Sequence, residues 1–135
     1  MKIKKIVSVL ILSALVAIFF VNLNSSLPDG YVNIDAVSAQ ARLESGAAVT
    51  VLDVRTPAEF KAGHIQGAVN IDYQGKLFES QLEGLDRDAQ YLVYCRTGNR
   101  STSALKLMHR QGFSMVWHLA HGIEDWTKKG LPLDK

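Results

Sequence analysis

Residues 91–101 read YLVYCRTGNRS, an apolar run followed at once by a cysteine, two arginines, a glycine and a serine. The run 91–94 predicts a buried strand, and residues 101–111 place apolar side chains at helical spacing before Gly112, a residue type that commonly ends helices. A strand that passes through a short polar loop into a helix is the repeating unit of an α/β fold. The stretch therefore predicts the fold class, and it puts the single cysteine of the chain, Cys95, at the end of a strand.

The same alternation continues on both sides of this stretch. Strands are predicted at residues 31–34, 49–54, 68–71, 91–94 and 115–119. Helices are predicted at residues 36–45, 56–63, 77–85, 101–111 and 123–129. Such alternation indicates a mostly parallel five-stranded sheet with helices on both faces. In open sheets of this kind ligands bind beyond the carboxyl ends of the strands, where Cys95, Asp53 and Arg55 are expected to lie.

Two of these helices carry start signals. Asp35 is a predicted N-cap of the first helix, which Gly46 ends. Thr56, Pro57 and Glu59 form a predicted capping box with proline at the first helical position.

A hydrophobic segment precedes the domain. Lys2, Lys4 and Lys5 stand before residues 6–21, which contain no charged residue. This is the pattern of an export signal, and the length also suits a membrane anchor that is not cleaved. A helix packed on the domain is disfavoured because the run has no polar face. We therefore divide the chain into a signal peptide or anchor at 1–26 and one domain at 27–135. The domain is expected to be periplasmic or otherwise extracytoplasmic, and an uncleaved segment would hold it at the inner membrane.

Charge and cysteine content exclude other classes. Without those three lysines, 12 basic residues face 13 acidic ones, so no basic field argues for a nucleic-acid partner. One cysteine cannot form an intramolecular disulfide. It is therefore a reactive thiol or an ordinary buried one.

The loop after Cys95 favours a reactive thiol. Its backbone N–H groups and the following helix start would form an anion cradle, and Gly98 can take a positive φ angle. A helix start and neighbouring arginines lower a thiol pKa, and Arg96 and Arg100 can also hold an anionic substrate. The alternatives are a small buried cysteine and two solvated arginines.

Four motifs extend this interpretation to the whole domain. They are DVRTPAEF at 53–60, GHIQGAVNI at 63–71, VYCRTGNRS at 93–101, and the pair GF at 112–113 and LAHGI at 119–123 with Trp126. In this order and spacing they resemble a single-domain rhodanese, over nearly all of residues 31–133.

The resemblance implies a sulfurtransferase. The nucleophile falls on Cys95, which would take a sulfane sulfur from thiosulfate or a similar small anionic donor, hold it as a persulfide, and pass it to cyanide or a thiol. No metal or organic cofactor is implied. The substrate-binding loop is Arg96, Thr97, Gly98, Asn99 and Arg100, and the supporting residues are Asp53 and Arg55.

Several neighbouring side chains are assigned otherwise. Arg55 could instead pair with Glu59 on the surface. The resemblance makes His64 a structural histidine, and it places His121 where the family usually has the first of two glycines. The aromatic residues Trp117, Trp126 and Phe60 are assigned to packing.

Two other functions remain open. Phosphatases and arsenate reductases of this fold also use a loop cysteine and arginine, but with five residues between them, where Cys95 and Arg100 enclose four. The shorter loop suits a single sulfur better. The second alternative is a non-catalytic sulfur carrier or interaction module at the membrane.

Overall fold

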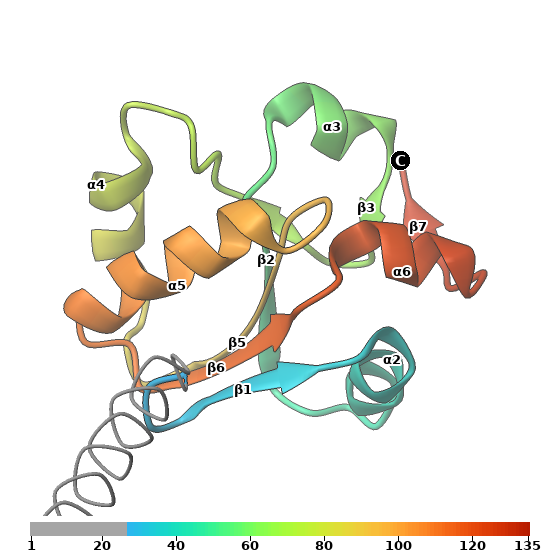
Figure 1. The fold of residues 1–135 in the computed structure, drawn as a ribbon, viewed down its shortest axis with the longest axis horizontal. Coiled ribbons are helices and arrows are strands. Elements are labelled where there is room, and N and C mark those ends of the chain that lie inside the picture. The colour runs from blue at the N-terminus through green and yellow to red at the C-terminus, as the bar shows by residue number, and fades with distance from the viewer. Residues whose placement is uncertain (1–26) are drawn as a thin grey trace, which may run out of the picture.

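The computed structural model describes residues 27–135, and the predicted export segment lies outside them. The central feature is a five-stranded parallel sheet in the order β1-β6-β5-β2-β4 (Figure 1). Its strands are β1 Tyr31–Ile34, β2 Val49–Asp53, β4 Val69–Asn70, β5 Gln90–Tyr94 and β6 Met115–Leu119. The predicted number of strands and their parallel direction are confirmed.

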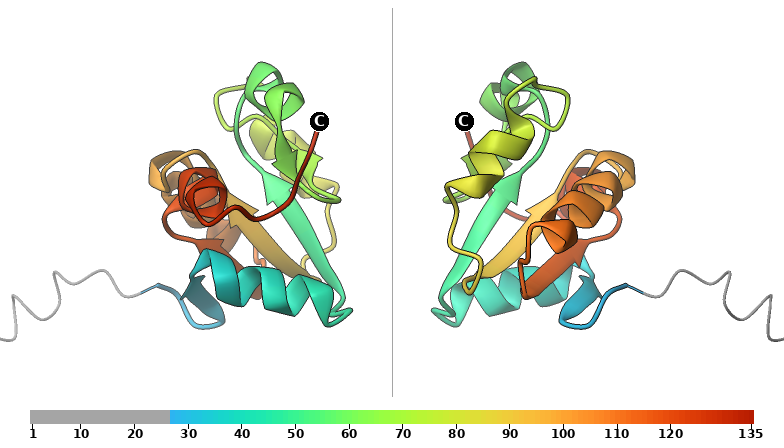
Figure 2. Two further views of the ribbon diagram at one scale, coloured as in Figure 1. Left: turned by 90° about the vertical axis from the view of Figure 1, so that its right-hand side faces the viewer. Right: turned by 90° about the vertical axis from the view of Figure 1, so that its left-hand side faces the viewer.

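Helices cover both faces of this sheet, as predicted (Figures 1 and 2). They are α2 Ala36–Glu44, α3 Pro57–Ala62, α4 Phe78–Glu83, α5 Asn99–Arg110 and α6 Gly122–Lys128. On one face α4 and α5 bury Phe78, Leu82 and Met108 against the sheet. On the other, α2 and α6 bury Ala39 and Trp126. Two apolar cores therefore hold the sheet between them, which is the usual arrangement for a parallel sheet.

The local start signals act as predicted. The Asp35 carboxylate accepts a hydrogen bond from the Ser38 backbone N–H at 2.9 Å. At the start of α3 the capping box is complete, with Pro57 in the first turn. Each cap satisfies backbone donors that a helix start leaves unpaired.

A second, two-stranded sheet was not predicted. Its strands β3 His64–Ile65 and β7 Leu133–Asp134 pair antiparallel. Each strand has two residues, too short to show a period in the sequence. The sheet ties residues 133–134 to the segment after α3 (Figure 1).

Among residues 27–135 no helix has the length and apolar character needed to cross a membrane.

Candidate active site

Cys95 lies where the sequence places it, directly after β5 and before α5. Strand β5 is the middle strand of the sheet, between β6 and β2. The cysteine side chain joins the apolar core on the α5 face, and Cys95 is only 1% exposed. The Cys95 sulfur therefore follows the central strand of the sheet and is largely removed from water.

Two polar groups lie within hydrogen-bond distance of the Cys95 sulfur. The Gly98 backbone N–H donates to Cys95 Sγ at 3.1 Å, and Ser101 Oγ lies 3.3 Å from Sγ. Burial raises the pKa of the thiol, but hydrogen bonds from Ser101, Gly98 and Thr97 outweigh it, so the pKa of Cys95 is lowered overall. The loop thus favours the thiolate, the form that acts as a nucleophile.

The conformation of this loop requires glycine at position 98. Gly98 has φ +105°, and a Cβ there would overlap the carbonyl oxygen of Ala120 in the turn between β6 and α6. The start of α6 also holds the loop, because the Ile123 N–H donates to the Cys95 carbonyl at 3.0 Å and the Glu124 N–H donates to the Arg96 carbonyl at 3.1 Å. Two segments distant in sequence therefore fix the shape of the loop.

Arg100 is held by a carboxylate from another helix. Its guanidinium donates to both oxygens of Glu59 at 2.7 and 2.8 Å. Oε2 of Glu59 also accepts from the N–H and hydroxyl of Thr56, each at 3.0 Å. These bonds, led by Arg100, lower the pKa of Glu59 to about 2. A bidentate pair thus joins α3 to the start of α5.

Arg96 is a different kind of group. Its Nε donates to Glu124 at 3.0 Å, and both side chains are exposed, at 65% and 43%. An exposed pair of this kind is weak, so the guanidinium can turn toward an anion at little cost. Arg96 is therefore the adaptable arginine of the loop, and Arg100 is the anchored one.

The alternative pairing of Arg55 with Glu59 is wrong. Arg55 pairs instead with Asp53, Nη2 to Oδ2 at 2.7 Å, and both side chains are buried. Nη2 also donates to the Gly63 carbonyl at 2.7 Å. Burial alone would lower the pKa of Arg55, but the hydrogen bond and charge of Asp53 raise it overall. The buried pair joins the end of β2 to the end of α3.

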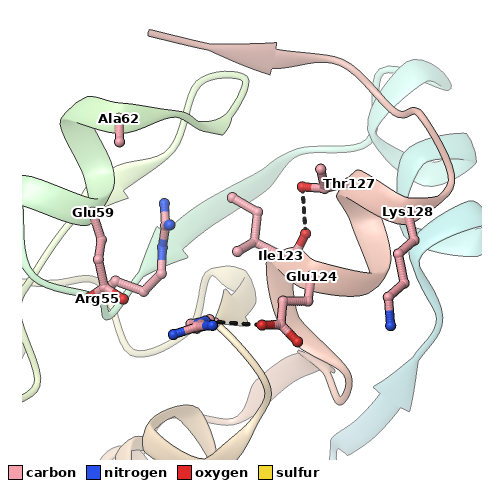
Figure 3. A pocket seen from close by; sticks show the side chains of 8 residues that line it. Arg55, Glu59, Ala62, Ile123, Glu124, Thr127 and Lys128 are labelled. Atoms are coloured by element: carbon pink, nitrogen blue, oxygen red, sulfur yellow. Dashed lines mark hydrogen bonds and ion pairs between the residues drawn. The ribbon is translucent and has the colours of Figure 1, made fainter.

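A cleft of about 650 Å³ opens beside these groups (Figure 3). Arg55, Glu59 and Arg96 line one part of it, and Ile123, Glu124, Thr127 and Lys128 of α6 line another. Its volume is in the range of pockets that bind small molecules. The lining combines basic, acidic and apolar groups, so it suits an anion with an apolar part better than a metal.

The remaining predicted assignments are also placed. His64 stacks on Phe60 with ring centroids 3.8 Å apart, and its Nδ1 lies 3.0 Å from the Phe60 carbonyl, as expected of a structural histidine. Trp126 is fully buried and donates to the Pro132 carbonyl at 3.0 Å. His121 is exposed beside the loop.

Two important side chains were not assigned to the site from the sequence. Ser101 was treated as the beginning of a helix, although its position six residues after the cysteine and at the first turn could have indicated a donor to the sulfur. Glu59 was assigned to the capping box, and its partner Arg100 is 41 residues away. Within residues 27–135, no group of three or more potential metal-ligating side chains comes together.

Comparison with known proteins agrees with this geometry. A sulfurtransferase of Allochromatium vinosum is 34% identical over 100 residues, covering 74% of this chain and 92% of its own. The thiosulfate sulfurtransferase GlpE of Pseudomonas fluorescens is 41% identical over 88 residues, covering 65% and 77%. The probable adenylyltransferase/sulfurtransferase MoeZ of Mycobacterium tuberculosis is 38% identical over 90 residues, but these cover 67% of this chain and only 23% of MoeZ.

A solved structure shows the same fold. The crystal structure of a rhodanese-related protein from Thermoplasma volcanium superposes with a TM-score of 0.67 at 33% identity, covering 77% of this chain and 98% of that one. The rhodanese-like domain family matches residues 35–129. This range includes the whole cysteine loop and every strand of the central sheet except β1. The chain belongs to the rhodanese-like domain family.

Proposed function

We propose that this protein is a sulfurtransferase that carries a sulfane sulfur on Cys95. The Cys95 thiolate attacks the outer sulfur of thiosulfate, an S–S bond forms, and the S–S bond of the donor breaks with release of sulfite. Cyanide or a thiolate then attacks the outer sulfur of the persulfide, and Cys95 leaves as thiolate. Neither displacement needs an external oxidant or reductant, and the two together predict ping-pong kinetics.

The hydrogen bonding of Sγ is the observation that carries this proposal. Gly98 and Ser101 surround the sulfur of a buried cysteine and lower its pKa, so the nucleophile exists without a separate general base. In the proposed persulfide the negative charge moves to the outer sulfur, toward the loop Arg96, Thr97, Gly98, Asn99 and Arg100. Backbone N–H groups and the start of α5 stabilise such an anion.

Each arginine has a separate role in the proposal. Arg100 holds the loop to α3 through Glu59, and Arg96 binds the sulfonate group of the donor after leaving Glu124. Arg55, whose charge is balanced by Asp53, lines the wall of the cleft. The cleft is larger than thiosulfate alone requires, and we propose that a thiol acceptor enters through it.

Intact mass spectrometry of the purified protein tests the assignment. Incubation with thiosulfate should add one sulfur atom, and cyanide should remove it as thiocyanate. Cys95→Ser is the matched control, because it replaces one atom and should neither gain sulfur nor produce thiocyanate. Thiocyanate formation by Cys95→Ser at the parent rate would refute the proposal. Absence of loading on folded, reduced protein would favour the oxyanion chemistry of a phosphatase, or a carrier that receives sulfur only from a partner protein.

We also propose, from the sequence of residues 1–26, that the domain works outside the cytoplasm. Cell fractionation with an antibody to the domain would place it in the periplasm or on the inner membrane. Recovery in the cytoplasm with an intact N-terminus would contradict this.

A further inference from the structure

A buried histidine lies behind the cysteine loop, and the reaction proposed above does not use it. His118, on β6, is 4% exposed. Its Nε2 lies 2.7 Å from Ser101 Oγ, the same oxygen that lies 3.3 Å from Cys95 Sγ. Its Nδ1 lies 2.9 Å from Oδ1 of the Asn33 amide on the neighbouring strand β1. Four side chains therefore form one hydrogen-bonded row from the exposed edge strand to the sulfur.

The hydroxyl of Ser101 has one hydrogen and three neighbours that could accept it. These are Cys95 Sγ, His118 Nε2 and the Gly98 carbonyl, 3.0 Å away. The Gly98 carbonyl already accepts from the N–H and hydroxyl of Thr102, at 3.0 and 2.8 Å. The hydrogen is therefore divided between the sulfur and the imidazole, and the proton on the imidazole decides between them.

The imidazole is neutral at ordinary pH, because burial, with a smaller effect of His121, lowers the pKa of His118 to about 4. A neutral imidazole carries its single proton on either Nδ1 or Nε2. With the proton on Nδ1, Nε2 takes the hydrogen of Ser101 and the sulfur loses that donor. With the proton on Nε2, the imidazole donates to Ser101 Oγ, and the hydroxyl hydrogen is free to point at Sγ. As placed, the exposed Asn33 amide presents its oxygen to Nδ1, which matches a proton on Nδ1. A half-turn of this amide presents its NH2 group instead and matches a proton on Nε2.

We propose that His118 is a positioning residue: with the Asn33 amide turned so that its NH2 group faces Nδ1, the His118 Nε2–H donates to Ser101 Oγ and thereby directs the Ser101 hydroxyl hydrogen toward the Cys95 sulfur. The thiolate requires this donor, and the uncharged inner sulfur of a persulfide does not. His118 therefore acts on Cys95 through Ser101, without touching the substrate. The inference concerns the thiolate that the proposed function needs, but an assay of thiolate reactivity tests it whether or not the protein transfers sulfur.

The test is the rate of Cys95 alkylation by iodoacetamide between about pH 5 and pH 9, where the rate follows the thiolate fraction. His118→Leu removes the N–H that donates to Ser101 Oγ. The S–H of the protonated Cys95 thiol can then donate to Ser101 Oγ instead, which favours the thiol over the thiolate. A buried thiolate with one hydrogen-bond donor fewer is less stable, so the thiolate fraction falls. We therefore expect His118→Leu to slow Cys95 alkylation by about fivefold or more near the acidic end of the pH range. His118→Gln keeps an amide N–H within reach of Ser101 and should restore a profile close to that of the parent.

A double-mutant comparison separates this role from a purely structural one. Ser101→Ala removes the donor to the sulfur, so it should slow alkylation at least as much as His118→Leu. If His118 acts through Ser101, adding His118→Leu to Ser101→Ala should cause no further slowing. The neighbouring residues Arg100 and His121 are unchanged in all of these variants. Equal profiles for His118→Leu and His118→Gln, or multiplied effects in the double variant, would overturn the proposal. Urea unfolding of each variant verifies that the measured protein is folded.

Discussion

Replacement of Glu59 by glutamine tests whether the ion pair between α3 and α5 holds the active loop in place. The Glu59 carboxylate accepts four hydrogen bonds, two from Arg100 and two from Thr56. Glutamine offers one oxygen and an NH2 group, which meets the N–H donors of Arg100 unfavourably. The variant keeps the size of the side chain and removes its charge and half of its accepting capacity.

The pKa of Glu59 provides the magnitude. Its shift from 4.5 to about 2 corresponds to about 3 kcal/mol at 1.36 kcal/mol per unit. The side chain is 30% exposed, and solvent screening reduces the contribution to about 1–2 kcal/mol. Because the pKa is lower in the folded state, this stabilisation is complete above pH 4.5 and is lost as the pH falls toward 2. We therefore expect Glu59→Gln to lose about 1–2 kcal/mol at pH 7 and less than half of that at pH 3.

Urea unfolding measures the free energy of unfolding of the parent and of Glu59→Gln at pH 7 and pH 3. Subtracting the two proteins at each pH removes the contribution of all other titrating groups. Glu83→Gln, at an exposed site on α4, is the control for loss of a surface charge. An equal loss at pH 7 and pH 3, or a loss at pH 7 no larger than that of Glu83→Gln, would refute this account of the ion pair.

Three further outcomes are expected. Gly98→Ala should destabilise the protein by about 2 kcal/mol or more in urea unfolding, because φ is +105° and a Cβ would overlap the backbone carbonyl of Ala120. Gly46→Ala is the control for the backbone cost alone, because Gly46 has φ +78° and no atom within 4 Å of the added Cβ. Arg96→Ala should change stability by less than about 1 kcal/mol, since its pair with Glu124 is exposed, while steady-state kinetics show a raised KM for thiosulfate. The pH profile of Cys95 alkylation should have its midpoint below that of the same protein unfolded in urea, and an equal or higher midpoint would contradict the lowered thiol pKa.

Much of the fold could be predicted because its signals are local. The buried strands are continuous apolar runs, and the helices show apolar spacing with caps that involve residues three positions apart. The sheet of β3 and β7 could not be predicted, because two-residue strands carry no period and these two pair His64 with Asp134 and Ile65 with Leu133, far apart in the sequence. The candidate site residues Cys95, Arg96, Gly98 and Arg100 were predicted from the composition of one loop, and the structure places this loop between β5 and α5.

The sequence alone determined where the strands of the central sheet and the helices lie, and it determined that the cysteine stands at the end of a strand and before a helix. These properties depend on hydrogen bonds and side-chain periods that act over a few residues. Only the tertiary structure decided the partners: Asp53 for Arg55, Glu59 for Arg100, and His118 for Ser101. Several carboxylates and polar groups compete for each partner in the sequence, and the packing of helices on the sheet decides which of them comes within hydrogen-bond distance.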